Sequence, residues 1–476
     1  MVTVFKVKSL NATDSAESGT FHIPFQQGRI GPLHSCLVVT FENGGFDIVI
    51  GNPPYIQLQK DGGDLADLYE NANYQTFDRM GDIYSLFYER GWQLLKPNGN
   101  LCYITSNKWM RAGYGEGTRR FLANNANPTL LIDFPEQKIF ESATVVTNIL
   151  LFTKGANKGK TFACTVTEKV LNNLSVFIRQ HGVASEFHTK DTWAILSPIE
   201  QRIKRKIELT GTPLKEWEIA INYGIKTGFN DAFIITGKER AELIKLDPKS
   251  AEIIRPILRG RDIKRYANSF ADLWLINTHN GIKEKGLKPI QIEDYPAIKK
   301  HLDKYYTELE KRADKGDTPY NLRNCAYMDD FSKQKIVWGN LNLRASYTLA
   351  EEGMFVNAPS PMIVPGNPYL LAVLNSTLGD YYVRNLGVIR NGGYFEYKPM
   401  FIEKLPVPVI DQVKQKPFAD LALQILEAKK SNLQTDELEN RLDQMIFELY
   451  KLSDDEIEYL LSGFRQIEVT NEVDLV

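Results

Sequence analysis

The sequence feature that most constrains this chain is an apolar segment that runs into two consecutive prolines. Residues 46–51 read Phe-Asp-Ile-Val-Ile-Gly and are followed by Asn52-Pro53-Pro54-Tyr55. Each proline holds φ at about −65° and lacks a backbone N–H group. The segment therefore predicts a buried strand, 46–51, that ends in a rigid corner, 52–55.

This corner presents two hydrogen-bond acceptors and a flat ring. The amide oxygen of Asn52 and the carbonyl of Pro53 can both accept from one NH2 group. Tyr55 carries a ring that can stack on another conjugated plane. The combination indicates a site for a planar amine, such as an adenine base rotated out of a duplex. A tetrapeptide of this kind in a loop can also be an ordinary turn.

The downstream sequence predicts a regular alternation of elements. An amphipathic helix at 82–95 ends at a Pro-Asn-Gly turn and precedes a strand at 101–105. A second helix at 116–124 leads to a strand at 129–134, and residues 138–152 read as a turn plus a strand. The predicted order is strand, helix, strand, helix, strand, strand, which is typical of an α/β sheet.

The corner and this ordered series resemble the amino-methyltransferases that use S-adenosylmethionine, most commonly the adenine-specific DNA methyltransferases. The resemblance implies that Asn52 and Pro53 accept the amine of the target base, that Tyr55 and Phe140 pack on its opposite faces, and that Pro54 lines the methyl-donor side. Relatives that methylate glutamine side chains or RNA guanines carry the same tetrapeptide. A protein or RNA methyltransferase therefore remains an alternative.

In that family a glycine-rich turn and an acidic residue that bind the cofactor precede the corner. Only 51 residues precede Asn52; they hold one plausible strand, 36–41, and no such turn. The glycine-rich stretch 113–117 is interpreted as a flexible entry to a helix. We therefore expect the main S-adenosylmethionine loop to be absent from this chain. The chain would then be a fragment, or a subunit whose partner or N-terminal half carries that loop and a nuclease.

A second region, about 195–408, opens with a basic helix at 200–207. In the segment 221–233, Gly224 and Gly228 flank Lys226 and Thr227, a pattern that could let the backbone approach a phosphate chain. A turn in a mixed sheet is the alternative. The segment resembles the opening of the target-recognition domain of type IIG restriction-modification enzymes, which implies that Lys226 and Thr227 contact DNA.

Further along, five basic residues lie within the eleven positions 255–265. Arg259 and Arg261 are candidates for contacts with phosphate or guanine, because a guanidinium can bind either in a bidentate manner. The alternative is a solvated loop with internal ion pairs. The resemblance to the recognition domain continues to residue 408.

At roughly 100–200 residues per domain, 476 residues imply two or three domains. The sequence predicts the α/β class: a partial Rossmann-like methyltransferase domain at 1–190, an α+β target-recognition domain at 191–408, and a helical segment at 409–476. That last segment carries an apolar stripe at helical spacing, interpreted as core packed on the recognition domain or used to set the spacing between domains. The stripe comprises Leu421, Ile425, Leu438, Leu442, Met445, Ile446 and Leu449.

Charge and composition limit the partners. Residues 201–270 carry 15 Lys+Arg against 9 Asp+Glu, a local excess of +6, whereas 411–476 carry 7 against 15, or −8. The middle of the chain can therefore face phosphates and the tail should not. Four cysteines are scattered without CxxC pairing, so neither a zinc site nor a disulfide framework is predicted. No signal segment or apolar run of membrane-spanning length occurs, which predicts a cytoplasmic protein without membrane contact.

The sequence thus predicts a site-specific DNA adenine methyltransferase that uses S-adenosylmethionine and double-stranded DNA, within a restriction-modification or related phage-defence system. The main alternative is a DNA-binding specificity remnant without catalysis. No convincing Asp followed by Glu-x-Lys on paired strands occurs, so cleavage by this chain alone is not expected.

Overall fold

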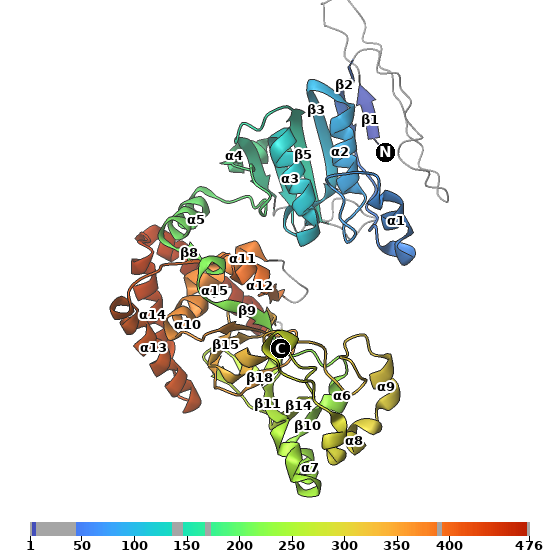
Figure 1. The fold of residues 1–476 in the computed structure, drawn as a ribbon. Helices are drawn as coiled ribbons and strands as arrows, with labels where there is room; N and C mark the ends of the chain where they lie inside the picture. Colours follow the sequence, from blue (N-terminus) through green and yellow to red (C-terminus); the bar gives the residue numbers. More distant parts are fainter. Residues whose placement is uncertain (1, 6–43, 136–145, 167–172, 388–392, 474–476) are drawn as a thin grey trace, which may run out of the picture. The chain divides into compact units, whose positions relative to one another are not determined.

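The computed structural model describes residues 2–5, 44–135, 146–166, 173–387 and 393–473. The chain divides into two compact units, Met1–Gln201 and Arg202–Val476 (Figure 1). Each unit has its own sheets and its own hydrophobic core. Among the helices of these described ranges, none combines the length and the apolar character needed to cross a membrane.

The first unit is built on one mixed sheet whose described strands lie in the order β1-β2-β3-β5-β4-β6-β7. Their bounds are β1 Val2–Phe5, β2 Phe46–Gly51, β3 Leu95–Ser106, β4 Ala126–Phe134, β5 Thr147–Lys154, β6 Thr161–Thr165 and β7 Val183–Ser185. Strands β2 and β3 are parallel, and β5 runs antiparallel to both β3 and β4. Hence β2, β3 and β4 point the same way and end at one edge.

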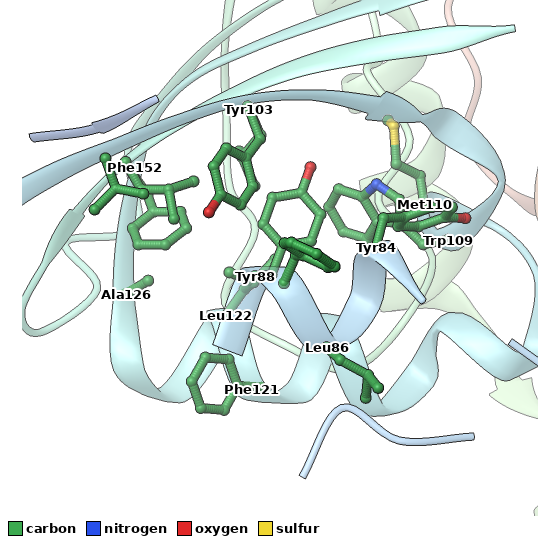
Figure 2. Close-up of a cluster of buried hydrophobic side chains, with 14 of the residues drawn as sticks. Tyr84, Leu86, Tyr88, Tyr103, Trp109, Met110, Phe121, Leu122, Ala126 and Phe152 are labelled. Atoms are coloured by element: carbon green, nitrogen blue, oxygen red, sulfur yellow. The ribbon is translucent and has the colours of Figure 1, made fainter. Parts of the chain in front are cut away.

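Helices α2 (Tyr84–Leu94) and α3 (Glu116–Asn125) pack on one face of this sheet, and α4 (Leu174–His181) packs against β6 on the other. Helix α1 (Asp64–Glu70) precedes α2. Figure 2 shows the core between the sheet and α2, in which aromatic rings predominate. The Tyr88 ring lies 5.6 Å from the rings of both Tyr103 and Trp109, centroid to centroid. Close ring packing fixes α2 against β3.

The structure confirms the predicted order of elements from β2 to β5. Strand β3 begins earlier than predicted, at Leu95, so the Pro-Asn-Gly turn lies inside its bounds. Asn98 in this turn has a φ of 63°. The prediction that β2 is buried is wrong for one face. Val49 is fully buried, whereas Ile48 and Ile50 are 36% and 43% exposed. The predicted strand 36–41 lies outside the described residues.

The second unit is α+β. One mixed sheet has the order β10-β14-β11-β18, with bounds Ile234–Thr236, Leu273–Ile276, Ile254–Leu258 and Phe355–Val356. An antiparallel sheet has the order β17-β15-β19-β9, with bounds Tyr347–Ala350, Lys335–Trp338, Pro361–Val364 and Ala220–Tyr223. Short pairs complete it: β8 (Thr212–Pro213) with β21 (Pro406–Val407), β12 (Ile263–Lys264) with β13 (Ala267–Asn268), and β16 (Leu341–Asn342) with β20 (Phe395–Glu396).

Short helices surround these sheets, and the hydrophobic core lies between the helices and the sheets. The helices are α6 Asn230–Phe233, α7 Gly237–Leu246, α8 Pro296–Asp303, α9 Tyr306–Lys311, α10 Pro368–Asn375, α11 Thr377–Leu386 and α12 Pro399–Ile402. Helix α5 (Pro198–Thr210) contains the boundary between the two units.

The last three helices, α13 (Gln412–Lys430), α14 (Asp436–Leu449) and α15 (Asp454–Val473), belong to the second unit. Helix α13 packs on α10, and α14 and α15 pack on α11. The predicted apolar stripe is core, since its residues Leu421, Ile425, Leu442 and Ile446 are at most 4% exposed. The C-terminal segment therefore shares its packing with the sheet-bearing part of this unit.

A buried ion pair fastens α14 to this unit. Arg265 Nε lies 2.6 Å from Glu439 Oε2, and the two side chains are 13% and 14% exposed. Arg265 also donates to the carbonyl of Asn375. Burial acts to raise the pKa of Glu439, but Arg265, Thr435 and Lys429 outweigh it and lower that pKa to about 2. The carboxylate is thus ionised throughout the physiological range.

We expect Glu439→Gln to lower the free energy of unfolding of the second unit by about 3 kcal/mol at pH 7, because it leaves the Arg265 guanidinium buried without its anion. The native pKa of Glu439 is below the unfolded value of about 4.3, so its contribution is complete above about pH 5 and is lost as the pH falls towards 2. Urea unfolding at several pH values measures the difference between the two proteins.

The exposed Glu437→Gln, two residues earlier on α14, is the matched control and should leave stability unchanged. An equal loss for Glu439→Gln at pH 7 and at pH 3 would contradict the assigned ion pair.

Candidate active site

The Asn-Pro-Pro-Tyr corner lies at the edge of the first sheet where the parallel strands end. It follows β2, while Ser106 ends β3 and Phe134 ends β4. At this edge Asn107 Nδ2 donates to Asp133 Oδ1 over 2.7 Å. Ligands of open α/β sheets bind outside the carboxyl ends of the strands. The corner is therefore at the position where such a sheet holds its ligand.

The four residues of the corner differ in burial, and the difference leaves the Asn52 amide, a hydrogen-bond acceptor, at the surface. Pro53 is buried, Pro54 and Tyr55 are half-buried, and Asn52 is exposed. The buried proline anchors the turn in the core, and its ring fixes the backbone there. The Asn52 side chain consequently lies at the surface on a rigid support.

Tyr55 is held at its hydroxyl end and along its ring. Its hydroxyl donates to the carbonyl of Ile104 on β3 over 3.3 Å. Its ring meets Tyr84 of α2 edge-on, with centroids 6.1 Å apart and planes at 88°. Burial raises the pKa of Tyr55 to about 12, so the phenol is neutral at physiological pH. The ring is thus oriented by two elements while the residue stays partly accessible.

The residues after the corner pair with the segment that immediately precedes α2. Leu58 N donates to the carbonyl of Gly81, and Ile83 N donates to the carbonyl of Ile56, both over 2.9 Å. Between them Asp82 is buried, and burial raises the pKa of its carboxyl group. The corner and α2 therefore form one rigid piece.

A buried polar network that the sequence did not predict lies in this unit. Thr105 Oγ1 is 2.8 Å from the Tyr88 hydroxyl and donates to Asn148 Oδ1 over 2.9 Å, and Trp109 Nε1 donates to the same oxygen over 3.2 Å. The network joins α2, β3 and β5. Strand β5 follows the segment that contains Phe140, which lies outside the described residues.

Residues 113–117 do lead into a helix, since α3 begins at Glu116, but the prediction that this entry is flexible is wrong, because the segment is tightly packed. A Cβ at Gly115 would lie 2.0 Å from the carbonyl oxygen of Trp109, and one at Gly117 would lie 3.0 Å from that of Gln75. These glycines allow close approach of two backbones.

In the second unit the predicted DNA contacts differ in their surroundings. Lys226 is exposed, and its Nζ lies 2.7 Å from Asp314 Oδ2. Thr227 is 2% exposed, and its hydroxyl donates to Asn230 Oδ1 over 2.6 Å. Gly224 packs against β18, since a Cβ there would lie 2.2 Å from the Val356 carbonyl oxygen. Lys226 therefore reaches the surface, whereas Thr227 and Gly224 hold the loop.

The basic stretch 255–265 is similarly divided. Arg259 makes three hydrogen bonds to the carboxylate of Asp262, from its backbone N, Nε and Nη2, over 2.8–2.9 Å. Arg265 is the buried partner of Glu439. Arg261 is exposed. Internal ion pairs thus engage Arg259 and Arg265, and Arg261 carries its charge at the surface.

The described residues of the first unit fit one side of a methyl-transfer site. They supply the acceptor corner, but the strand beside β2 is β1, which runs antiparallel to it and pairs Val2 with Gly51. In ranges 2–5, 44–135, 146–166 and 173–201, no strand followed by a glycine-rich turn lies beside β2 to hold the nucleoside of a methyl donor. These described residues therefore supply the acceptor corner, and beyond the corner they offer no residue that we identify with a methyl donor.

The mixed sheet, with the Asn-Pro-Pro-Tyr corner at its carboxyl edge, agrees with the α/β fold that the resemblance to the amino-methyltransferases implied. Residues 8–140 match the Eco57I restriction-modification methylase family, and residues 255–407 match the TaqI-like C-terminal specificity domain. Together the two matches support a type II restriction-modification methyltransferase with a specificity domain.

Characterised relatives of similar sequence are also restriction-modification methyltransferases. The Type II methyltransferase M.BstVI of Geobacillus stearothermophilus is 22% identical over 447 residues, covering 87% of this chain and 75% of that protein. The Type II restriction enzyme and methyltransferase RM.Eco57I of Escherichia coli is 24% identical over 432 residues, covering 79% of this chain and 42% of that protein. The chain thus spans three quarters of the first relative and less than half of the second.

A solved structure supports the fold. The Type IIL restriction-modification enzyme MmeI, determined in complex with DNA, matches with a TM-score of 0.57 at 14% identity. The match covers 89% of this chain and 57% of that one.

We expect Gly115→Ala to destabilise the first unit by about 1–3 kcal/mol, because the new Cβ would overlap the backbone of Trp109. Thermal unfolding of the purified protein measures the loss. Gly155→Ala is the matched control, since a Cβ there meets nothing within 4 Å. Equal melting temperatures for the two variants would show that the packing of 113–117 is looser than described.

Proposed function

We propose that the protein methylates the exocyclic amine of adenine at specific sites in double-stranded DNA, with S-adenosylmethionine as methyl donor. The observation that carries this proposal is the acceptor corner at the carboxyl edge of the sheet, with the exposed Asn52 and the oriented ring of Tyr55 three positions apart in sequence. The matches to a methylase family and to a specificity domain support it.

The chemistry requires an oriented amine. The lone pair of the adenine amine is delocalised into the ring, and the atom is inaccessible in a stacked duplex, so the base must be flipped out at a cost of a few kcal/mol. The Asn52 amide oxygen and the Pro53 carbonyl then accept its two N–H groups and direct the lone pair away from the ring plane. S-adenosylmethionine, when bound, supplies an electrophilic methyl group. The contribution of this chain is orientation and acceptor placement.

Aromatic side chains also hold the flipped base by stacking on its two faces. Tyr55 covers one face of the adenine, and its neutral phenol keeps its bond to Ile104 throughout the reaction. Phe140 covers the other face, and Pro54 lines the donor side. In the second unit, Lys226 and Arg261 contact DNA directly, because their charges lie at the surface. Thr227 and Arg259 act indirectly, by holding the loops that carry those residues.

Asn52→Ala should lower the rate of transfer at least about a hundredfold, because it removes one of the two amine acceptors from an orientation-dependent reaction. Fold and DNA affinity should be retained, since Asn52 is exposed. Mass spectrometry of N6-methyladenine measures the rate, in DNA incubated with S-adenosylmethionine and the protein, together with the polypeptide that supplies the donor loop if this chain alone does not bind S-adenosylmethionine.

Gln59→Ala, an exposed amide outside the corner, is the matched control and should methylate normally. Normal methylation by Asn52→Ala, or a methylated base other than adenine, would overturn the proposed roles.

Titration with S-adenosylmethionine separates this function from a DNA-binding specificity remnant. The enzyme should bind it, either as this chain alone or together with a polypeptide that supplies the donor loop. DNA binding without S-adenosylmethionine binding in either form would favour the remnant.

A further inference from the structure

Three loops of the second unit line a cavity of about 590 Å³ that is open to solvent. Its walls are the end of β9 with the residues after it, 223–226, the loop 323–327, and residues 358–359. The sequence pattern pointed to only the first of these loops. The cavity brings residues about 100 positions apart in the sequence to one place.

The rim of this cavity carries an unequal set of charges. Lys226 Nζ and Arg323 Nη1 lie 2.7 Å and 3.1 Å from the two carboxylate oxygens of Asp314. The Lys226 and Arg323 side chains are 57% and 60% exposed, whereas Asp314 is 21% exposed. The hydrogen bond from Lys226, with Arg323 nearby, lowers the pKa of Asp314, so it stays ionised. Two cations share one anion, so these three side chains together carry a formal charge of +1.

Aromatic side chains line the same cavity. Tyr223 is 40% exposed, and Tyr327 is half-buried with its pKa raised to about 12 by burial. Both phenols are neutral, since burial also raises the pKa of Tyr223. Burial raises the pKa of Cys325, which also lines the cavity, to about 11, so its thiol is protonated and unreactive. The cavity thus combines stacking surfaces with a cationic rim.

The walls are fixed by backbone hydrogen bonds. Gly224 N donates to the Ser360 carbonyl over 2.8 Å, and Ile225 N donates to the Val356 carbonyl over 2.7 Å. The volume lies within the range of about 300–1,000 Å³ found for ligand sites, which accommodates a nucleotide and excludes a duplex. Proteins hold single nucleotides of a strand with aromatic platforms next to cations.

We propose that this cavity receives one nucleotide of the DNA substrate, with its phosphate at Lys226 and Arg323 and its base or sugar against Tyr223 and Tyr327. The inference rests on the proposed function in taking DNA as the ligand. It assigns a DNA contact to Arg323, Tyr223 and Tyr327, and it gives Lys226 a defined partner group.

The test measures the affinity of the whole chain for a fluorescent mixed-sequence DNA duplex at several salt concentrations. The double variant Lys226→Ala/Arg323→Ala should bind about tenfold more weakly at 0.1 M salt, with a salt slope shallower by about one for each phosphate that the variant no longer neutralises. The control Lys245→Ala/Arg441→Ala removes two exposed cations outside the cavity and should bind as the unaltered chain does.

Two further variants exclude a purely structural effect. Asp314→Asn should bind DNA several-fold more tightly and with a steeper salt slope, because both cations lose their anion; a folding defect cannot produce this gain. Tyr223→Ala should weaken binding about tenfold, because its ring no longer stacks on the nucleotide. Tyr306→Ala, with the same 40% exposure but outside the cavity, should not.

A binding measurement with adenosine monophosphate shows whether the ligand of the cavity is a nucleotide of DNA or a free nucleotide. Tight binding of adenosine monophosphate that depends on Lys226 and Arg323, with DNA affinity unchanged in their double variant, would overturn the inference. Unchanged DNA binding by all cavity variants would overturn it as well, together with the DNA contact of Lys226, while leaving the proposed methyl transfer at the corner intact. Failure of the unaltered chain to bind DNA would overturn both.

Discussion

The arrangement of this protein depends on a proline-fixed corner at the carboxyl edge of parallel strands. Pro53 is buried, which holds the backbone at the corner in place, and Ile56 pairs with Ile83, the residue just before α2. An acceptor is useful for an oriented transfer only when it is rigid, because a displacement of about 1 Å can cost a hundredfold in rate. Packing of α2 on the sheet supplies that rigidity.

Charge pairing divides the basic residues of the second unit into two kinds. Arg265 and Arg259 are neutralised by nearby carboxylates and hold the fold together. Lys226 and Arg323 share a single carboxylate and remain largely exposed. A positively charged stretch of sequence is therefore a poor guide to a DNA surface unless the location of its anions is known. In this protein Asp314 pairs with two cations, so one positive charge near it is not neutralised.

The sequence predicted the order of elements and the position of the corner, because hydrophobic periodicity and proline chemistry are local. It could not predict that Ile48 and Ile50 are exposed, since an apolar strand reads the same whether one face or both are covered. Nor could it show that Arg265 meets Glu439, 174 positions away. The hydrogen-bond network around Asn148 could not be predicted either, because its members come from separate elements. Each of these features is set by tertiary packing.

The most direct measurement of the central claim is a structure of the protein bound to a duplex selected for tight binding. We expect an adenine rotated out of the helix, with its exocyclic nitrogen within about 3 Å of both Asn52 Oδ1 and the Pro53 carbonyl oxygen and its ring against Tyr55. An adenine that stays stacked, or a flipped base held elsewhere with nothing at the corner, would contradict it.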